Sequence, residues 1–401
     1  MPRTTPSNAS RLSRDAQRLI FLTKSLALSG CHLEDTYWER LLEQHIGKLL
    51  RGRRNKHIES VLDHLLDQDA DAYEILVEQA ETLSESTTLA VDGRAYDALL
   101  LSVPLVAWTR YRIPGGALEA SLRDGVAEKL LACVAAQDAR LFLMPELIGF
   151  DQMPRTFQQT WGWTQNLGLA ALGAKNESCN IPPAEDADEI LADARFLIGA
   201  IVVPQGVPVF RWQEDVQDAP SRDQCLQTWR RECAELLGPM FTGCTIEYLL
   251  PDAYYVNNRE ADRRVRPLAL RAAITWLQTA VGVPPTEVHA TIVGCGESAL
   301  EEFRVGFSTR QSNQVIYGCV WPVLSKEEAI IDSGDATEAD TPDQIAALLK
   351  ELGVQDIRRL PGLQAADYCE DCGAPYFPNP LGEMQHPEIP EEANLTPAHF
   401  H

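Results

Sequence analysis

The sequence lacks a long apolar segment. Its most apolar stretches, residues 98–108 and 196–210, are short and contain proline, so neither is expected to span a bilayer. Residues 1–18 are polar and lack the apolar core of a signal peptide. The ten cysteines lie mostly inside apolar runs, which is typical of reduced thiols in a cytosolic protein. We therefore expect a cytoplasmic protein with no membrane partner.

Several catalytic motifs are also missing. The chain has no Gly-x-Ser-x-Gly elbow, no P-loop and no His-Glu-x-x-His helix, and His289 is the only histidine between residues 65 and 385. A histidine-based catalytic triad is therefore not expected in the central region. Residues 294–299 match Gly-x-Gly-x-x-Ala, but the next expected strand, 302–308, follows too soon for the long helix that a dinucleotide site needs. No nucleotide cofactor is expected.

Positive charge is scarce and unevenly distributed. The formal net charge of −23 opposes attraction of the whole molecule to nucleic acid or anionic lipid. Residues 1–60 nevertheless carry eleven Lys or Arg against six Asp or Glu, whereas residues 327–401 carry three against sixteen. A basic cluster contains Arg51, Arg53, Arg54 and Lys56. It indicates either a patch for phosphate, nucleic acid or an acidic partner, or a solvated loop at a helix end.

The expected fold is α/β (mixed α+β). Helical periodicity predicts a helical N-terminal unit over residues 1–87 with four short helices. Asp92-Gly93 predicts a hairpin at the start of a duplicated α/β domain, residues 88–282. An antiparallel meander over residues 283–325 is expected to complete the core, and an acidic linker follows at 326–341. Residues 342–401 are expected to form a helix, a strand and a Cys-x-x-Cys tail.

The duplication is inferred from two pairs of similar strings. Residues 102–108 (SVPLVAW) resemble 206–212 (GVPVFRW), and residues 141–156 resemble 249–267 in having a strand, a proline, an acid and a helix. The pattern predicts two strand–helix–strand–helix repeats, at about 96–172 and 195–281, whose strands are largely parallel or mixed. The second string, LLPDAYYVNNREADRRVRP, is interpreted as a strand-end turn followed by a helix from residue 264.

The tail contains the most specific chemical motif. Cys369 and Cys372 form a Cys-x-x-Cys pair followed by Gly373, and His386 lies fourteen positions after Cys372. This pattern predicts a structural zinc knuckle with Cys369, Cys372 and His386 as ligands. His399, His401, Glu388 or a core cysteine could supply the fourth ligand. Two alternatives stay open: unligated turn cysteines, and a redox pair, which the acids Glu370 and Asp371 disfavour.

The duplication also supplies an enzymatic hypothesis. Glu146 and Asp252 occupy matching positions, so pseudo-symmetry could bring them to one cleft as catalytic groups. An adjacent anion-binding group would consist of Arg259, Arg263, Arg264 and Arg266. The alternative is that both acids cap helices and that the arginines pair with Glu260 and Asp262.

Six strings carry a resemblance to a known family. They are residues 11–19, 33–39, 210–214, 249–255, 259–267 and 369–375 (RLSRDAQRL, LEDTYWE, FRWQE, LLPDAYY, READRRVRP and CEDCGAP). Over nearly the whole chain the sequence resembles an uncharacterised bacterial family catalogued only as a domain of unknown function. The resemblance implies a bacterial cytosolic protein and carries no activity with it. Residues 326–341 and the last few residues match none of the family's strings.

The first hypothesis is therefore a non-catalytic binding or regulatory protein with a structural zinc knuckle. The second is an enzyme that acts on a phosphate-containing or other anionic substrate in a cleft between the repeats. A weaker third hypothesis is association with nucleic acid or the ribosome.

Overall fold

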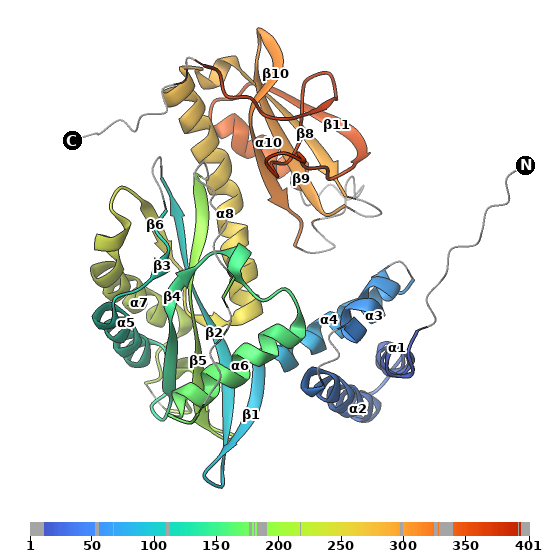
Figure 1. Cartoon of the computed structure of the whole chain (residues 1–401), viewed down its shortest axis with the longest axis vertical. Coiled ribbons are helices and arrows are strands. Elements are labelled where there is room, and N and C mark those ends of the chain that lie inside the picture. Colours follow the sequence, from blue (N-terminus) through green and yellow to red (C-terminus); the bar gives the residue numbers. More distant parts are fainter. Residues whose placement is uncertain are drawn as a thin grey trace, which may run out of the picture.

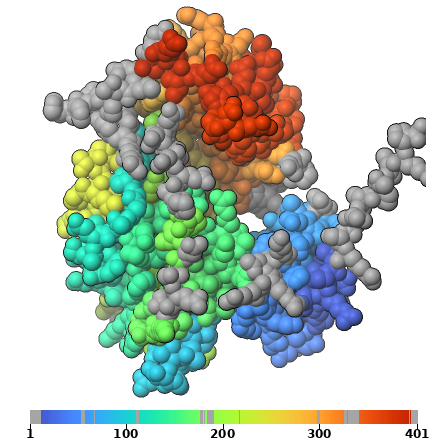
Figure 2. All heavy atoms as spheres, in the orientation of Figure 1, coloured from blue at the N-terminus to red at the C-terminus, as the bar shows by residue number. Residues whose placement is uncertain are grey.

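The computed structural model describes most of the chain (Figure 1). The described residues are 12–52, 56–66, 68–109, 113–175, 179, 181–182, 191–216, 218–296, 300–324, 328, 340–391 and 393. The expected linker at 326–341 lies largely outside them. In the space-filling view, the C-terminal unit lies above the central unit and the N-terminal helices lie to one side (Figure 2). Within the described residues, no helix has both the length and the apolar character needed to cross a bilayer.

The N-terminal unit contains the four helices that the periodicity predicts. They are α1 (Arg14–Ala27), α2 (His32–Arg51), α3 (Lys56–Leu66) and α4 (Ala70–Glu85). Ser13 and Asp69 cap α1 and α4 by accepting hydrogen bonds from backbone N–H groups of the first turn. The helices bury one apolar stripe each, and Phe157 and Trp161 of a later helix pack against the same cluster. The unit is thereby attached to the central domain.

A hairpin of β1 (Ser86–Val91) and β2 (Arg94–Trp108) follows at the predicted place. Asp92 and Gly93 both have positive φ, 52° and 74°, as a two-residue turn of type I′ requires. The long strand β2 becomes the centre of the larger sheet.

The larger sheet has seven strands in the order β1-β2-β5-β4-β3, and β6 and β7 pair with β2. The new elements are β3 (Gly116–Ala117), α5 (Ala120–Cys133), β4 (Arg140–Ile148), α6 (Phe157–Ala171), β5 (Ala192–Pro204), α7 (Arg222–Leu237), β6 (Thr245–Tyr248), β7 (Asp252–Ala253) and α8 (Tyr254–Trp276). Helices α5 and α7 pack on one face, and α6 and α8 on the other. The elements thus run strand–helix–strand–helix twice, as expected.

The expectation of largely parallel or mixed strands is wrong for this sheet, in which every described pairing is antiparallel. The two halves exchange strands: β5 of the second half lies between β2 and β4 of the first, and β2 lies between β5 and β6. Strands of one half therefore run parallel to each other without being neighbours. Alternation of strands and helices in a sequence does not reveal such an insertion.

One of the two string pairs is also misaligned. Residues 102–108 lie within β2, whereas residues 206–212 follow the end of β5 and enter the 3-10 turn Arg211–Gln213. The second pair agrees with the structure, because Pro145 lies where β4 shifts register against β5, and Pro251 separates β6 from β7. Proline lacks the N–H of a strand ladder, which explains an interruption at both places.

Helix α8 is longer than predicted. It begins at Tyr254 instead of residue 264, contains Pro267, and ends in the π-helical turn Leu277–Val281. Its first half packs on the larger sheet, and its second half packs on the C-terminal sheet (Figure 1). This single helix therefore belongs to the cores of both units.

The C-terminal unit is built on a four-stranded sheet in the order β10-β9-β8-β11. Its elements are β8 (Val288–Cys295), β9 (Glu302–Thr309), β10 (Ser312–Pro322), α10 (Thr341–Glu351) and β11 (Asp356–Gln364). The predicted meander is confirmed, and β8 and β9 form an antiparallel pair across the Gly-x-Gly string. With α8 and α10 the meander forms a core of its own instead of completing the core of the larger sheet.

A small hairpin of β12 (Phe377–Pro378) and β13 (Met384–Gln385) lies against this sheet. Two glycines allow the close approach. A Cβ atom at Gly306 would lie 2.1 Å from the carbonyl oxygen of Pro378, and one at Gly318 would lie 2.3 Å from the ring of Phe377. The tail is therefore packed on β9 and β10 at fixed positions.

Candidate metal centre

The two tail cysteines lie on a tight loop. Tyr368 and Pro375 form a β-bridge at its base. Inside the loop the amide of Gly373 donates to the carbonyl of Cys369 (2.9 Å), and the amide of Cys369 donates to Ala374 (2.8 Å). Gly373 has a φ of 73°, a conformation that glycine adopts without strain. The loop therefore has the knuckle conformation that the Cys-x-x-Cys-Gly pattern predicts.

The β12–β13 hairpin brings His386 to this knuckle. Asn379 fixes the turn of the hairpin, because its side-chain oxygen accepts from the amides of Leu381 and Glu383 at 2.9 Å each. His386 follows β13 directly, and its Nε2 lies 3.1 Å from Sγ of Cys372. One ligand atom from each of Cys369, Cys372 and His386 lies within 4.8 Å of the others. Three residues predicted as ligands therefore converge.

The dimensions of this cluster are close to those of a zinc site. Tetrahedral zinc bonds sulfur at about 2.3 Å and nitrogen at about 2.0 to 2.1 Å, which places neighbouring ligand atoms about 3.3 to 3.8 Å apart. Two thiolates with an imidazole form a soft-to-borderline set that suits zinc better than magnesium or calcium. Among the residues that the structure describes, no fourth His, Cys, Asp or Glu joins the group. His399 and His401 lie outside the described residues.

The local hydrogen bonds favour the thiolate form of Cys369. Backbone N–H groups of Cys372 and Asp371 lower the pKa of Cys369, and the side chains of Cys372 and Tyr376 contribute in the same direction. Burial has the opposite effect on core thiols such as Cys319, whose pKa rises to about 12. The knuckle is thus suited to metal binding, which requires the deprotonated sulfur.

A buried arginine holds the knuckle on the sheet. Arg304 of β9 is completely buried and donates to the carboxylate of Glu302 (2.6 Å). Its Nη1 donates to the backbone carbonyls of Asp367 (2.7 Å) and Tyr376 (2.8 Å), which flank the loop on both sides. The ring of Tyr368 covers the guanidinium at 4.9 Å. Arg304 therefore fixes both ends of the metal-binding loop.

The comparisons with known proteins match this chain to one family. The model of a family described as "Protein of unknown function (DUF2863)" matches residues 4–400. The chain belongs to the DUF2863 family. No curated protein and no solved structure matches the chain. The family has no assigned activity, so a function for this DUF2863 member has to be inferred from its own residues.

The predicted pair of catalytic acids is separated by strands. Glu146 lies on β4 and Asp252 on β7, and strands β5 and β2 run between them. Three strand spacings of about 4.8 Å place the two backbones roughly 14 Å apart. Asp252 forms an ion pair with Arg222 of α7, and its side chain is 13 % exposed.

The four arginines of the predicted anion site are on α8 and face carboxylates. Arg259 contacts Glu81 at 2.6 Å, and Arg264 contacts Glu260 at 2.8 Å. Arg266 is buried, and its Nη1 contacts Glu328 at 2.8 Å and the carbonyl of Pro322 at 2.7 Å. Arg263 is held more loosely, with its nearest carboxylate oxygens at 3.9 Å.

The basic cluster is described only in part. Arg51 ends α2 and lines a pocket of about 520 Å³ together with Trp161 and Asp97. Arg53, Arg54 and the side chain of Lys56 lie outside the described residues.

Sequence reasoning does not find the buried Glu85 and Arg304 or the half-buried Asp193, and it gives the half-buried Asp262 only as an alternative partner of the arginines. Burial raises the pKa of Glu85 to about 7 and that of Asp262 to about 6, and it also raises the pKa of Asp193 in spite of its contact with Arg195. An oxygen of Glu85 accepts from the amide of Tyr255 at 2.8 Å, at the start of α8. For Arg304 a weak signal was present, since a lone charge inside the apolar strand Phe303–Phe307 predicts a buried partner.

Proposed function

We propose that this DUF2863 member binds one zinc ion through Cys369, Cys372 and His386, and that it acts as a non-catalytic binding or regulatory protein. The observation that supports the proposal most strongly is the convergence of the three ligand atoms within 4.8 Å. They come from two segments, the knuckle and the end of a hairpin. The ion would therefore join two parts of the tail.

A structural role for the ion follows from the small core of the tail. Its two strands are two residues long, and Phe377 is the large apolar side chain that the hairpin buries. A segment with so little buried apolar surface gains stability from a metal crosslink. The packing of Phe377 on Gly318 transmits that stability to the four-stranded sheet.

Hydrogen exchange with and without a zinc chelator tests the proposal. Removal of zinc is expected to speed exchange of the Cys369 and Gly373 amides, both of which are hydrogen-bonded inside the loop. The β1–β2 hairpin serves as an internal control, because it lies in the other unit. If the chelator does not change the exchange rates of the knuckle amides, the alternative of unligated turn cysteines is supported instead of a zinc site. An intrachain disulfide between Cys369 and Cys372 in freshly purified protein would favour the redox alternative.

A second candidate function is an enzyme acting on a phosphate-containing or other anionic substrate between the two halves. It is favoured by Arg263, which is 43 % exposed and has no carboxylate oxygen closer than 3.9 Å among its ion pairs. Inorganic pyrophosphate is the probe, and Arg263→Ala is compared with Arg310→Ala of the other unit. Pyrophosphate binding that is lost in Arg263→Ala but kept in Arg310→Ala would support an anion site. Absence of pyrophosphate binding to the wild type would exclude that site.

The nucleic-acid or ribosome hypothesis depends on Arg51 and its basic neighbours. Binding through this cluster would weaken steeply as salt is added, because lysines and arginines displace counterions from phosphates. Absence of binding to RNA at low ionic strength would exclude it. We propose a cytoplasmic location for all three functions, since every described cysteine is free.

A further inference from the structure

The outer face of α1 and α2 carries a group of exposed apolar side chains. Four of the twelve large apolar side chains exposed among the described residues lie within residues 21–37: Phe21, Leu28, Leu33 and Tyr37. Leu28 is 85 % exposed and Leu33 is 82 % exposed. The two helices lie on the outer side of the N-terminal unit, and none of these four side chains belongs to its core (Figure 1). Apolar residues exposed singly are common, whereas a contiguous exposed patch indicates a binding surface.

Helical spacing and ring contacts make this group contiguous. Phe21 and Leu28 are seven positions apart along α1, and Leu33 and Tyr37 are four positions apart on α2, so each pair lies on one side of its helix. Trp38 joins the two helices, because its ring lies 5.8 Å from that of Phe21 and 5.0 Å from that of Tyr37, both edge to face. These five residues are called the aromatic patch.

Three arginines accompany the aromatic patch. The guanidinium of Arg18 lies 5.4 Å from the ring centre of Phe21, and that of Arg40 lies 5.9 Å from the ring centre of Tyr37. Arg14 lies one turn before Arg18 on α1. None of the three arginines forms an ion pair with a described residue, although the lysines of the same two helices do. A guanidinium stacked on a ring still offers N–H donors at its edge, so the patch presents positive charge that a carboxylate can neutralise.

We infer that the aromatic patch is a docking surface for an acidic, amphipathic protein segment. The apolar side chains of that segment would cover the patch, and its carboxylates would pair with Arg14, Arg18 and Arg40. Tryptophan, tyrosine and arginine side chains supply much of the binding energy of protein interfaces, and complementary charge selects the partner. The surface belongs to the N-terminal unit, so this inference does not depend on the proposed zinc site.

Other anionic partners fit this surface less well. Glu39 and Glu43 are exposed on the helix that carries Arg40, and the carboxylate of Glu34 accepts from the indole N–H of Trp38 at 3.2 Å. A nucleic-acid strand or an anionic bilayer presents continuous negative charge, which these acids and the net charge of −23 oppose. A protein segment can place its carboxylates at the arginines alone and leave the acids of α2 in solvent.

A second copy of the chain is also disfavoured as the occupant. In a two-fold dimer the same surface faces itself, so the patch of one copy would meet the patch of the other. Arg14, Arg18 and Arg40 of the two copies would then be brought together, and like charges repel each other. The charge of the patch therefore calls for a different, negatively charged surface.

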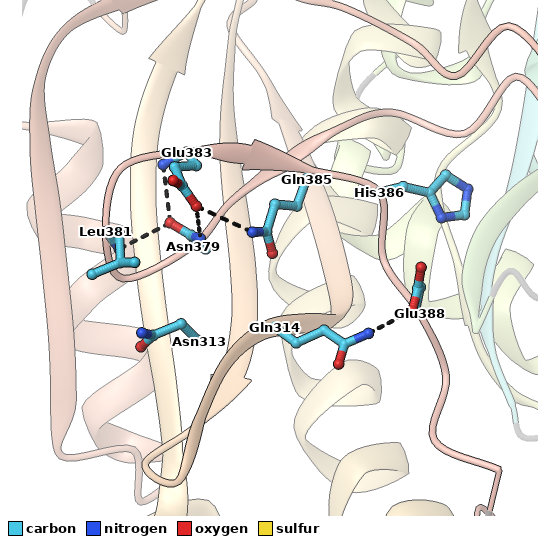
Figure 3. Close-up of a pocket in the computed structure, with 8 residues that line it drawn as sticks. All are labelled: Asn313, Gln314, Asn379, Leu381, Glu383, Gln385, His386 and Glu388. Carbon is cyan, nitrogen blue, oxygen red and sulfur yellow. Dashed lines mark hydrogen bonds between the residues drawn. The ribbon is translucent and has the colours of Figure 1, made fainter.

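The polar pocket beside the metal centre is a poor alternative for the same segment. Its volume is about 480 Å³, and Figure 3 shows His386 and Glu388 at one end and Leu381 at the other. Glu383 and Glu388 contribute carboxylates, and no Lys or Arg is among the described residues that line the pocket. An acidic segment would be repelled there, so we assign its binding to the N-terminal unit.

Fluorescence anisotropy with the full chain tests the inference. The probe is a labelled amphipathic helical peptide of leucine and glutamate, and its counterpart has lysine in place of every glutamate. Single-stranded RNA and phosphatidylserine vesicles serve as probes for the other anionic partners. Analytical ultracentrifugation of the protein alone reports self-association.

Two double variants alter the surface without touching the core: Arg18→Glu/Arg40→Glu and Leu28→Ser/Leu33→Ser. Their matched controls alter exposed side chains outside the N-terminal unit: Arg94→Glu/Arg271→Glu and Val216→Ser/Val256→Ser. The wild type and both controls should bind the leucine–glutamate peptide equally, and added salt should weaken that binding. Each surface variant should bind it about tenfold more weakly or worse. The leucine–lysine peptide should not bind.

The inference is overturned if the wild type fails to bind the leucine–glutamate peptide at low ionic strength, or if it binds the lysine counterpart as tightly. It is also overturned if both surface variants bind like their controls. RNA or vesicle binding that Arg18→Glu/Arg40→Glu abolishes, in the absence of peptide binding, would assign the surface to nucleic acid or lipid instead. A wild-type dimer that Leu28→Ser/Leu33→Ser dissociates would assign it to a second copy.

Discussion

Replacement of Arg304 by alanine should destabilise the C-terminal unit and weaken zinc binding together. The substitution leaves the carbonyls of Asp367 and Tyr376 without their charged donor and leaves Glu302 without its cation, in a place where the arginine is completely buried. Loss of one partner of a buried ion pair costs about 3 to 5 kcal/mol. The knuckle would then lack the hydrogen bonds that join Asp367 and Tyr376, on either side of it, to Arg304 of the sheet. Loss of such an outer contact typically weakens metal affinity about 10- to 100-fold.

Chemical denaturation and chelator competition measure the two effects. Arg310→Ala is the matched control, because Arg310 follows the same strand but is 49 % exposed and lies 3.8 Å from Asp356. Its replacement should change stability by less than about 0.5 kcal/mol. Arg304→Lys keeps the charge but loses the planar fork, so it should fall between the two. A cost below about 1 kcal/mol for Arg304→Ala, or a zinc affinity equal to that of Arg310→Ala, would refute the assigned role.

Two further substitutions test the burial of Glu85 and the packing of β12 on the C-terminal sheet. Burial raises the pKa of Glu85 to about 7 in the folded protein. The folded state therefore loses stability as the pH rises from about 4.5 through 7, because the buried carboxyl must ionise. Glu85→Gln should stabilise the protein by up to about 3 kcal/mol at pH 8 and leave its stability unchanged at pH 4. A pH-independent effect in denaturation curves would contradict this. Gly318→Ala places a methyl group 2.3 Å from the ring of Phe377. It should lower the free energy of unfolding by about 1 to 3 kcal/mol and reduce zinc affinity. The control is Gly30→Ala, whose added methyl group has no atom within 4 Å and should leave zinc affinity unchanged. Equal zinc affinities of these two variants would show that β12 does not support the centre.

Local signals in the sequence predict individual elements well. The stripe of Leu226, Trp229, Cys233 and Leu237 predicts a helix over 222–237, and α7 has these bounds. Asp92-Gly93 predicts a turn that the structure contains. The two cysteines and the histidine of the tail are also predicted together from the sequence, because the Cys-x-x-Cys-Gly pattern is local and His386 lies only fourteen positions after Cys372.

Features that depend on distant segments are not accessible in this way. The insertion of β5 between β2 and β4 depends on pairing with β2 across 84 to 108 residues and with β4 across 48 to 62 residues. The role of Arg304 is not predictable from its local sequence, because its acceptor carbonyls lie 63 and 72 positions away. The carboxylate partners of Arg259 and Arg266 are likewise on other elements, at Glu81 and Glu328. When its partners lie on distant elements, an arginine-rich string therefore suggests an anion site.

The start of α8 shows a different limitation. Pro251, Asp252 and the two tyrosines that follow are typical of a turn, and the local sequence predicts one there. In the structure the helix begins directly after β7, and Glu85 of α4 accepts from its first turn at the Tyr255 amide. A cap supplied from another helix cannot be read from the local sequence.

We propose that Cys369, Cys372 and His386 hold one zinc ion. The most direct test is the metal content of the intact protein by native mass spectrometry after exposure to zinc and removal of the excess. The wild type and Cys31→Ser, which replaces an exposed cysteine outside the centre, should carry one zinc ion per chain, and Cys369→Ser should carry none. A metal-free wild type, or zinc bound equally by Cys369→Ser, would contradict the claim.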